Sequence, residues 1–158
     1  MPEPPQDLSH VFEQGESPSP RDHELLANLR RVLPELRELV HDLDESEEDG
    51  IYRFWHHSWK VYALQDDTER IVALLDQARP EGTQLHPWFR TIVSQGTGRR
   101  WERSHNPRWL KETRPIVEAW WHAAYFARMA LRYAEELEYA PRWMPSGWAA
   151  LLELYGVR

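Results

Sequence analysis

The segment from Ile116 to Leu137 constrains the fold most strongly, because it is apolar around most of a helical circumference. Small and aromatic residues recur three or four positions apart on one side of this predicted helix: Ile116, Trp120, Ala123, Ala127, Ala130 and Ala134. Small residues allow neighbouring helices to approach closely. A helix with so little polar surface needs other helices around it. We therefore expect it at the centre of a helical bundle.

The same helix keeps one narrow polar stripe, formed by Glu118, His122, Tyr125, Arg128, Arg132 and Glu136. A membrane span requires about 18 or more consecutive apolar residues. Because charges interrupt this segment, the pattern favours a buried helix of a soluble protein.

A leucine-rich seam precedes the aromatic part of the chain, between residues 21 and 43. Its apolar residues alternate three and four positions apart: Leu26, Leu29, Leu33, Leu36, Val40 and Leu43. This spacing predicts an amphipathic helix, and the narrow seam also suits pairing with a second helix. Pro34 removes a backbone hydrogen bond, so we expect a kink or a break near Leu33.

Six acidic residues fall within positions 42–49. We interpret 44–49 as an acidic linker, with Ser46 capping the next helix. Residues 1–50 carry a net charge of −10 and residues 51–158 a net charge of +3, so an acidic front part joins a slightly basic back part.

Further helices are predicted on both sides of the central one. A stripe of three- and four-residue spacing runs from about Gly50 to Gln77, and a short helix starts near Pro87. The pair Asn106-Pro107 favours another helix start, and Pro115 a kink or a second start. Ser146 can cap a last helix that ends at Gly156.

These elements predict an all-α protein with a single compact bundle of four to five helices. Residues 1–20 are rich in proline and polar residues and are expected to form a disordered tail. Residues 21–158 form the helical domain, and 50–158 is its Trp-rich core. No run of residues alternates apolar and polar side chains as a strand would.

Cysteine is absent from the chain. Disulfides, thiolate zinc sites and a cysteine nucleophile are therefore excluded, and the absence fits a cytoplasmic location. No G-x-S-x-G motif or paired carboxylates indicate catalysis. We expect no cofactor, and the catalytic residues, if the protein has any, are unknown from this pattern.

Two nine-residue stretches, 54–62 and 118–126, combine aromatic rings with histidine. Rings on a helix supply apolar area for a core, whereas an imidazole can be a ligand, a base or a core residue. Polar residues near these rings define a candidate small-molecule pocket: His57, Gln65, Glu118 and His122. His57, Glu118 and His122 are also weak metal candidates, because helical bundles bind metals through inward Glu and His.

A basic segment at 99–114 is the third candidate binding site, after the small-molecule pocket and the metal site. Arginines interleaved with Trp101 and Trp109 favour contact with phosphate and stacked bases, and the candidate anion-binding residues are Arg99, Arg100, Arg103 and Arg108. The net charge of −7 opposes binding to nucleic acid, so we do not expect that partner. Pairing with the acidic residues at 42–49 is the alternative.

The absence of catalytic motifs and the leucine seam together predict a non-enzymatic module that binds a protein partner or a second copy of itself. The alternatives are a small-molecule or metal-binding bundle, and phosphate or nucleic-acid contact through residues 99–114. No membrane partner is expected.

Overall fold

A computed structural model of the chain describes residues 19–48, 61–100, 110–137 and 147–156. The described residues form helices and no strand, which confirms the all-α class. Six helices are found instead of four to five: α2 (Pro20–Arg31), α3 (Leu33–Glu48), α4 (Val61–Gln77), α5 (Pro87–Thr97), α6 (Leu110–Glu136) and α7 (Trp148–Leu154). None of these helices combines the length and the apolar character that a membrane span requires.

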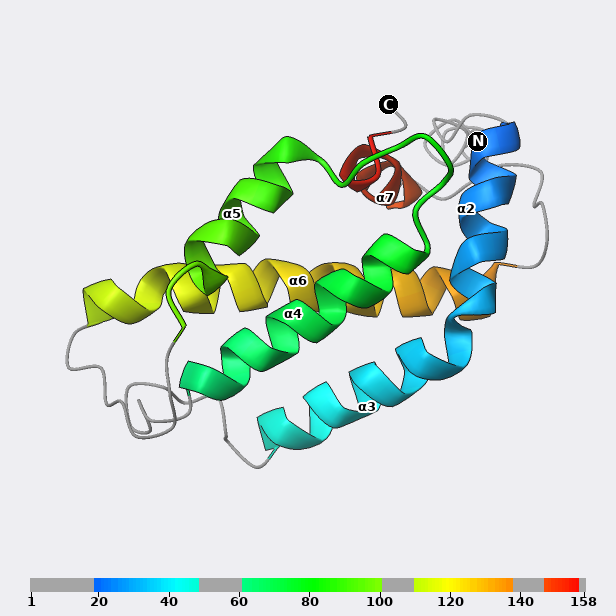
Figure 1. Ribbon diagram of the computed structural model, residues 1–158. Coiled ribbons are helices and arrows are strands. Elements are labelled where there is room, and N and C mark those ends of the chain that lie inside the picture. Colours follow the sequence, from blue (N-terminus) through cyan, green and yellow to red (C-terminus); the bar gives the residue numbers. More distant parts are fainter. Residues whose placement is uncertain (1–18, 49–60, 101–109, 138–146, 157–158) are drawn as a thin grey trace, which may run out of the picture.

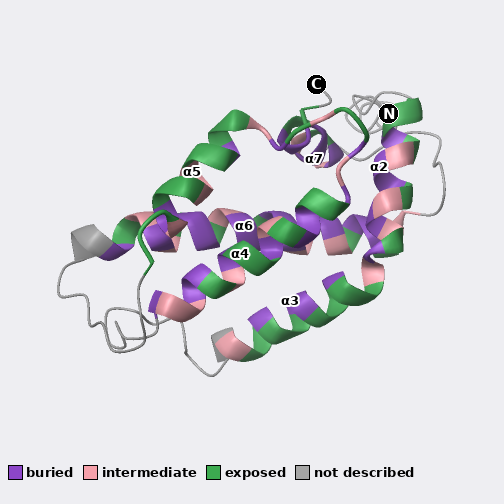
Figure 2. Cartoon of the chain, in the orientation of Figure 1, coloured by how far each residue is buried: buried purple, intermediate pink, exposed green. Residues whose placement is uncertain are grey.

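The long helix α6 lies at the centre, as its sequence predicts. It runs behind α4 across the molecule and contacts each of the other five described helices (Figure 1). Every residue of the predicted small and aromatic stripe is buried: Ile116, Trp120, Ala123, Ala127, Ala130 and Ala134. Figure 2 shows how much of α6 is enclosed compared with α3 and α5. The alanines supply the close approach that lets several helices share one core.

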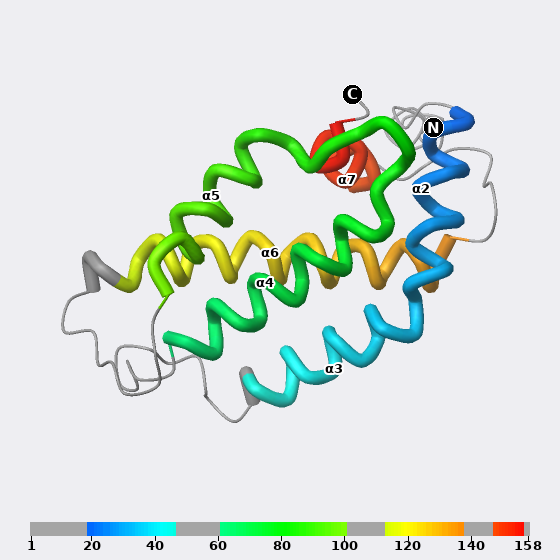
Figure 3. The backbone as a smooth tube through the Cα atoms, in the orientation of Figure 1, coloured from blue at the N-terminus to red at the C-terminus, as the bar shows by residue number. Residues whose placement is uncertain are grey.

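The leucine-rich segment is two helices, which accounts for part of the higher helix count. Val32 is a turn residue between α2 and α3, and Pro34 is the second residue of α3. The backbone changes direction where α2 meets α3 (Figure 3). A proline is tolerated in a first turn, where its missing N–H has no helical partner. Leu29, Leu36 and Leu43 are almost completely buried within the same chain. The seam therefore packs on its own bundle.

The predicted acidic linker at 44–49 is wrong for most of its length, because α3 continues through Glu48. Ser46 consequently lies inside α3 and does not cap the next helix. Cross-helix ion pairs offset the clustered charge: Asp42 pairs with Arg70 of α4 at 3.0 Å, and Asp44 with Arg128 of α6 at 2.9 Å. Glutamate also has a good helix propensity.

Buried hydrogen bonds fasten the C-terminal helix α7 to the bundle. The indole N–H of Trp148 donates to the buried carboxylate of Asp22 at 2.9 Å. Asp22 also completes the capping box of α2 with Ser19. The hydroxyl of Tyr155, directly after α7, donates to the carbonyl of Leu75 at 2.7 Å. The two ends of the described chain thus meet on one side of the core.

The structure agrees with some of the other predicted helix ends and differs from others. The second predicted helix ends at Gln77 as expected, and its part before Val61 lies outside the described residues. The helix start predicted at Asn106 and Pro107 also lies outside them. Pro115 does not start a second helix, since α6 is a single element around it. Gly147, rather than Ser146, precedes α7, and Gly156 ends it with a φ of 65°.

Candidate functional site

The outward side of α6 differs from its buried side. Residues spaced three, four or seven apart form an outer stripe, which consists of Arg114, Glu118, Trp121, Tyr125, Arg132 and Glu136. All six are exposed. Trp121 is 58% exposed and Tyr125 49% exposed, although rings of this size normally bury most of their surface. The stripe therefore presents two aromatic rings to solvent, with charges on either side.

Ring contacts extend this aromatic surface to α5. Trp88 is 49% exposed, and its ring lies edge-on against His122 with centroids 5.0 Å apart. His122 also contacts Trp121 at 4.9 Å, and Trp121 stacks on Tyr125 at 6.3 Å with an interplanar angle of 16°. We call Trp88, Trp121, His122 and Tyr125 the aromatic face. Among the described residues, the exposed large hydrophobic side chains are Trp88, Trp121 and Tyr125, and all three belong to this face.

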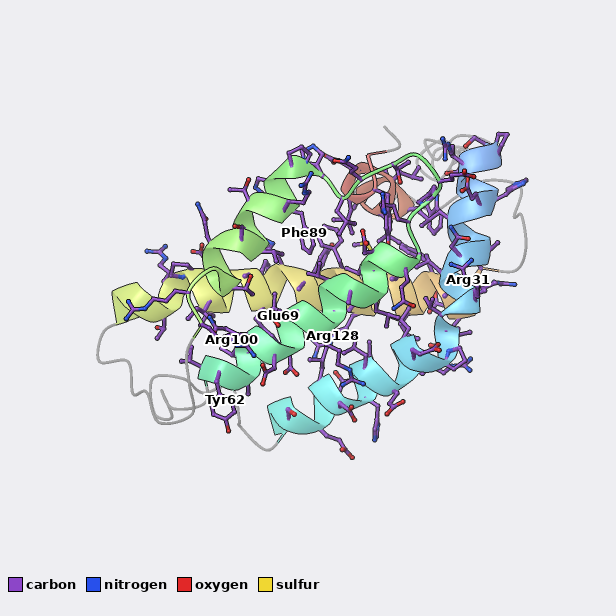
Figure 4. All side chains as sticks on the ribbon, viewed as in Figure 1. Arg31, Tyr62, Glu69, Phe89, Arg100 and Arg128 are labelled. Atoms are coloured by element: carbon purple, nitrogen blue, oxygen red, sulfur yellow. The ribbon has the colours of Figure 1, made fainter. Side chains whose placement is uncertain are left out.

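The packing of α5 on α6 positions this face. Gly96 lies so close to α6 that an added Cβ would overlap the side chain of Ala119 and lie 2.8 Å from the carbonyl oxygen of Pro115. At the other end of α5, Phe89 packs edge-on against Phe126 at 5.6 Å, and Figure 4 shows Phe89 between α5 and the core. Because Phe89 is buried, its neighbour Trp88 projects outward.

The local start of α5 fixes Trp88 further. His86 caps the helix, and its Nδ1 accepts the backbone N–H of Trp88 at 3.1 Å. The backbone N–H of His86 in turn donates to the carbonyl of Leu154 at 2.6 Å. Pro87 follows at the first helical position, where its fixed φ suits the helix. His86 thereby links the start of α5 to the end of α7.

Two pockets flank the aromatic face. One, of about 410 Å³, is lined by residues of α6 together with Gly147, and includes Trp121, Tyr125, Met129, Arg132 and Tyr133. The other, of about 440 Å³, is lined by His86, Trp88, Phe126, Ala150, Glu153 and Leu154. Both volumes suit the insertion of a large side chain or a small ligand.

The predicted ligand-pocket residues have different surroundings. Gln65 is fully buried, and its amide donates to the carbonyls of Gly96 at 3.0 Å and Arg99 at 2.7 Å. It thus satisfies backbone acceptors at the C-terminal end of α5. Glu118 is exposed and pairs with Arg114 at 3.1 Å, and His122 belongs to the aromatic face. Gln65 is therefore a buried contact to the backbone, whereas Glu118 is a surface residue.

The weak metal candidates include His57, which lies outside the described residues. Within the described ranges, no group of three or more His, Asp or Glu side chains is placed to hold a metal ion.

The described part of the basic segment pairs with α4. Arg100 forms ion pairs with Asp66 and, at 2.7 Å, with Glu69 (Figure 4). Arg103 and Arg108 lie outside the described residues, whereas the carbonyl of Arg99 accepts from Gln65. Asp42 and Asp44 form ion pairs with Arg70 and Arg128, neither of which belongs to residues 99–114.

Trp88, Trp121 and Tyr125 were not predicted as a surface. Their aromatic content indicates a core, and Trp121 directly follows the buried Trp120. One signal was present, because Tyr125 and His122 belong to the predicted polar stripe of the helix.

The chain matches no family model, and no curated protein or solved structure is significantly similar to it. Its function therefore has to be argued from its own side chains.

Proposed function

We propose that this protein is a non-enzymatic protein-interaction module, and that its contact surface is the aromatic face of α5 and α6. The observation that carries the proposal is the exposure of Trp88, Trp121 and Tyr125 in one cluster joined by ring contacts. Exposed apolar surface is unfavourable in water, so a contiguous patch that persists indicates a binding site.

The composition around the aromatic face supports a protein partner. Trp, Tyr, Met and Arg are the residue types enriched in the cores of protein interfaces, and Trp, Tyr and Arg dominate their binding energy. Here Met129 and Arg132 line the pocket beside Trp121 and Tyr125. Two aromatic anchors next to a pocket that accepts a side chain are the arrangement that such hot spots need.

The leucine seam no longer supports partner binding, because five of its six residues are buried inside the chain and Leu33 is partly buried. The proposal therefore moves from α2 and α3 to the outer side of α6. The absence of cysteine remains compatible with the cytoplasmic location that we include in the proposal.

The alternatives have less support. A small-molecule site built from Gln65 and Glu118 would need a buried amide and an exposed carboxylate to act together. Phosphate contact through Arg100 would have to displace Asp66 and Glu69, and their carboxylates repel an anion.

Site-specific photo-cross-linking in the cells that produce the protein tests the proposal. A benzophenone amino acid is placed at Tyr125, and for comparison at Ala73, an exposed residue of α4. We expect a protein adduct at position 125 that is largely lost when Trp121→Ser is added, and none at position 73. Equal adducts at both positions, or none at position 125, would refute the aromatic face as a protein-binding surface.

A further inference from the structure

We infer that the aromatic face is a self-association surface, on which the α6 helices of two copies pair antiparallel around a two-fold axis at Tyr125. This inference rests on the proposed function, because it specifies the partner of the same surface. It follows from the order of charges along the outer stripe of α6 and from the pocket beside Trp121.

The charges of the outer stripe are arranged symmetrically about Tyr125, with opposite signs. Glu118 and Arg132 lie seven residues before and after Tyr125, and Arg114 and Glu136 lie eleven residues before and after it. Seven residues are about two helical turns, or roughly 10.5 Å along the axis. In an antiparallel pair with its axis at Tyr125, each acidic residue would therefore face a basic residue of the second copy.

Two-fold symmetry doubles these contacts. Glu118 of one copy faces Arg132 of the other, and Arg132 of the first faces Glu118 of the second. The same holds for Arg114 and Glu136. A parallel pair in register would instead place Arg114 against Arg114 and Glu118 against Glu118, which is repulsive. The charge order thus selects the antiparallel orientation.

The four charged side chains are available for such contacts. Each is more than half exposed, and they form ion pairs within α6 itself, Arg114 with Glu118 and Arg132 with Glu136. Isolated pairs of this kind contribute little, whereas alternating charges on two helices form a network. Complementary rim charges mainly determine orientation and specificity, so the affinity has to come from the apolar centre.

The centre of the stripe offers that apolar contact. Trp121 and Met129 lie four residues before and after Tyr125, so the indole of one copy would meet the thioether of the other. Met129 lines the pocket of about 410 Å³ together with Tyr125 and Tyr133. A second copy would insert its Trp121 there, and sulfur–aromatic contact is favourable. The two Tyr125 rings would meet at the axis.

The flanks of α6 leave this stripe accessible. Arg128 and Glu135 on one flank are paired with Asp44 and Arg37 of α3. On the other flank, His122 contacts Trp88 of α5. Side chains on both flanks are thus engaged within the chain, and among the described residues no other helix forms an ion pair with the outer stripe between them.

Charge reversal tests the arrangement. Sedimentation velocity of the full chain is measured over a range of concentrations for the wild type, Glu118→Arg, Arg132→Glu and the double variant. We expect a wild-type dimer of twice 18.9 kDa, at least a tenfold weaker dimer for each single reversal, and recovery to near wild-type affinity in the double variant. Thermal melting of each monomer confirms folding. No wild-type dimer, or no recovery in the double variant, would overturn the inference.

Disulfide trapping locates the axis independently. The chain has no cysteine, so Tyr125→Cys introduces a single thiol. Residues that face each other at a two-fold axis meet the distance limits of a disulfide. We expect Tyr125→Cys to form a covalent dimer under mild oxidation, and the control Ala149→Cys, exposed on α7, to stay monomeric. Equal trapping in both variants would contradict an axis at Tyr125.

The two proposals fail in different ways. If the photo-cross-linked adduct at position 125 depends on Trp121 but has a mass other than twice that of the chain, the interaction surface stands and self-association is wrong. If position 125 gives no adduct, both are wrong.

Discussion

The two sides of α6 carry similar residue types in different roles. Trp120 and Trp121 are adjacent in the sequence, yet Trp120 is 7% exposed and Trp121 is 58% exposed. Alanines predominate on the buried side, together with Ile116, Phe126 and Tyr133, and the small alanines allow the other helices to contact α6 closely. The outer side combines large rings with charges at regular spacing. Aromatic content alone therefore does not distinguish a core from a contact surface. The residues three and four positions away do, because they are mostly small and apolar on the buried side and charged on the outer side.

Truncating the two neighbouring tryptophans tests this contrast with the largest expected effect. Trp120→Ala should lower the free energy of unfolding by about 3–5 kcal/mol, because it leaves a cavity in the core. Trp121→Ala should change it by no more than about 0.5 kcal/mol in the monomer, as for other surface positions. Urea unfolding at low protein concentration measures both values. Comparable losses in the two variants would contradict the assignment of the two sides.

Enlarging the contact between α5 and α6 should have the next largest effect. Gly96→Ala places a methyl group against Ala119 and the carbonyl of Pro115, so we expect the free energy of unfolding to fall by about 1–3 kcal/mol. Ser94→Ala, at an exposed position of the same helix, is the matched control and should be close to neutral. A stabilised Gly96→Ala protein would show that the two helices are not in close contact.

The buried hydroxyl of Tyr155, directly after α7, predicts that the stability of the fold depends on pH in the alkaline range. Burial raises the pKa of the Tyr155 hydroxyl above its usual value of 10.0. Above about pH 10 the unfolded chain therefore loses a proton that the folded chain retains. Tyr155 should then reduce the stability by about 1.4 kcal/mol per pH unit, while below pH 10 its contribution is constant.

The variant Tyr155→Phe separates this contribution from that of other tyrosines. Urea unfolding at several pH values should show a shallower loss of stability above pH 10 in the variant than in the wild type. Tyr133, whose pKa is also raised by burial, accounts for part of the remaining slope. Parallel curves for the two proteins would show that Tyr155 titrates normally in the folded state.

The smallest effect is expected on the outer stripe. Arg114→Ala removes an exposed ion pair with Glu118 within α6 and should lower the free energy of unfolding by at most about 0.5 kcal/mol. Chemical denaturation of the monomer gives this value. A loss above about 1 kcal/mol would indicate that Arg114 has a role in the core of the fold.

The helical periodicity predicted most of the fold. All six residues of the predicted central stripe are buried, and the break between α2 and α3 falls at Val32, two residues before Pro34. The acidic segment was misinterpreted because its charge is offset by Arg70 and Arg128, which are distant in the sequence. Local patterns do not contain such partners.

The candidate site was less predictable for the same reason. Gln65 flanks the apolar stripe of its helix and was a ligand candidate, but its partners are the backbone carbonyls of Gly96 and Arg99. Trp88 follows Pro87, the first residue of the short helix α5. It is exposed because the neighbouring Phe89 occupies the side of α5 that faces the core. The symmetric charge order around Tyr125 was visible in the sequence, although it acquires meaning only once this side of α6 is known to be exposed.

Hydroxyl-radical footprinting at low and high protein concentration tests the central claim most directly. If the outer stripe of α6 is a contact surface between copies, oxidation of Trp121 and Tyr125 should fall several-fold as the concentration rises. The buried Trp148 should be protected equally throughout. Oxidation of Trp121 and Tyr125 that stays constant while the protein associates would place the contact elsewhere and contradict the account.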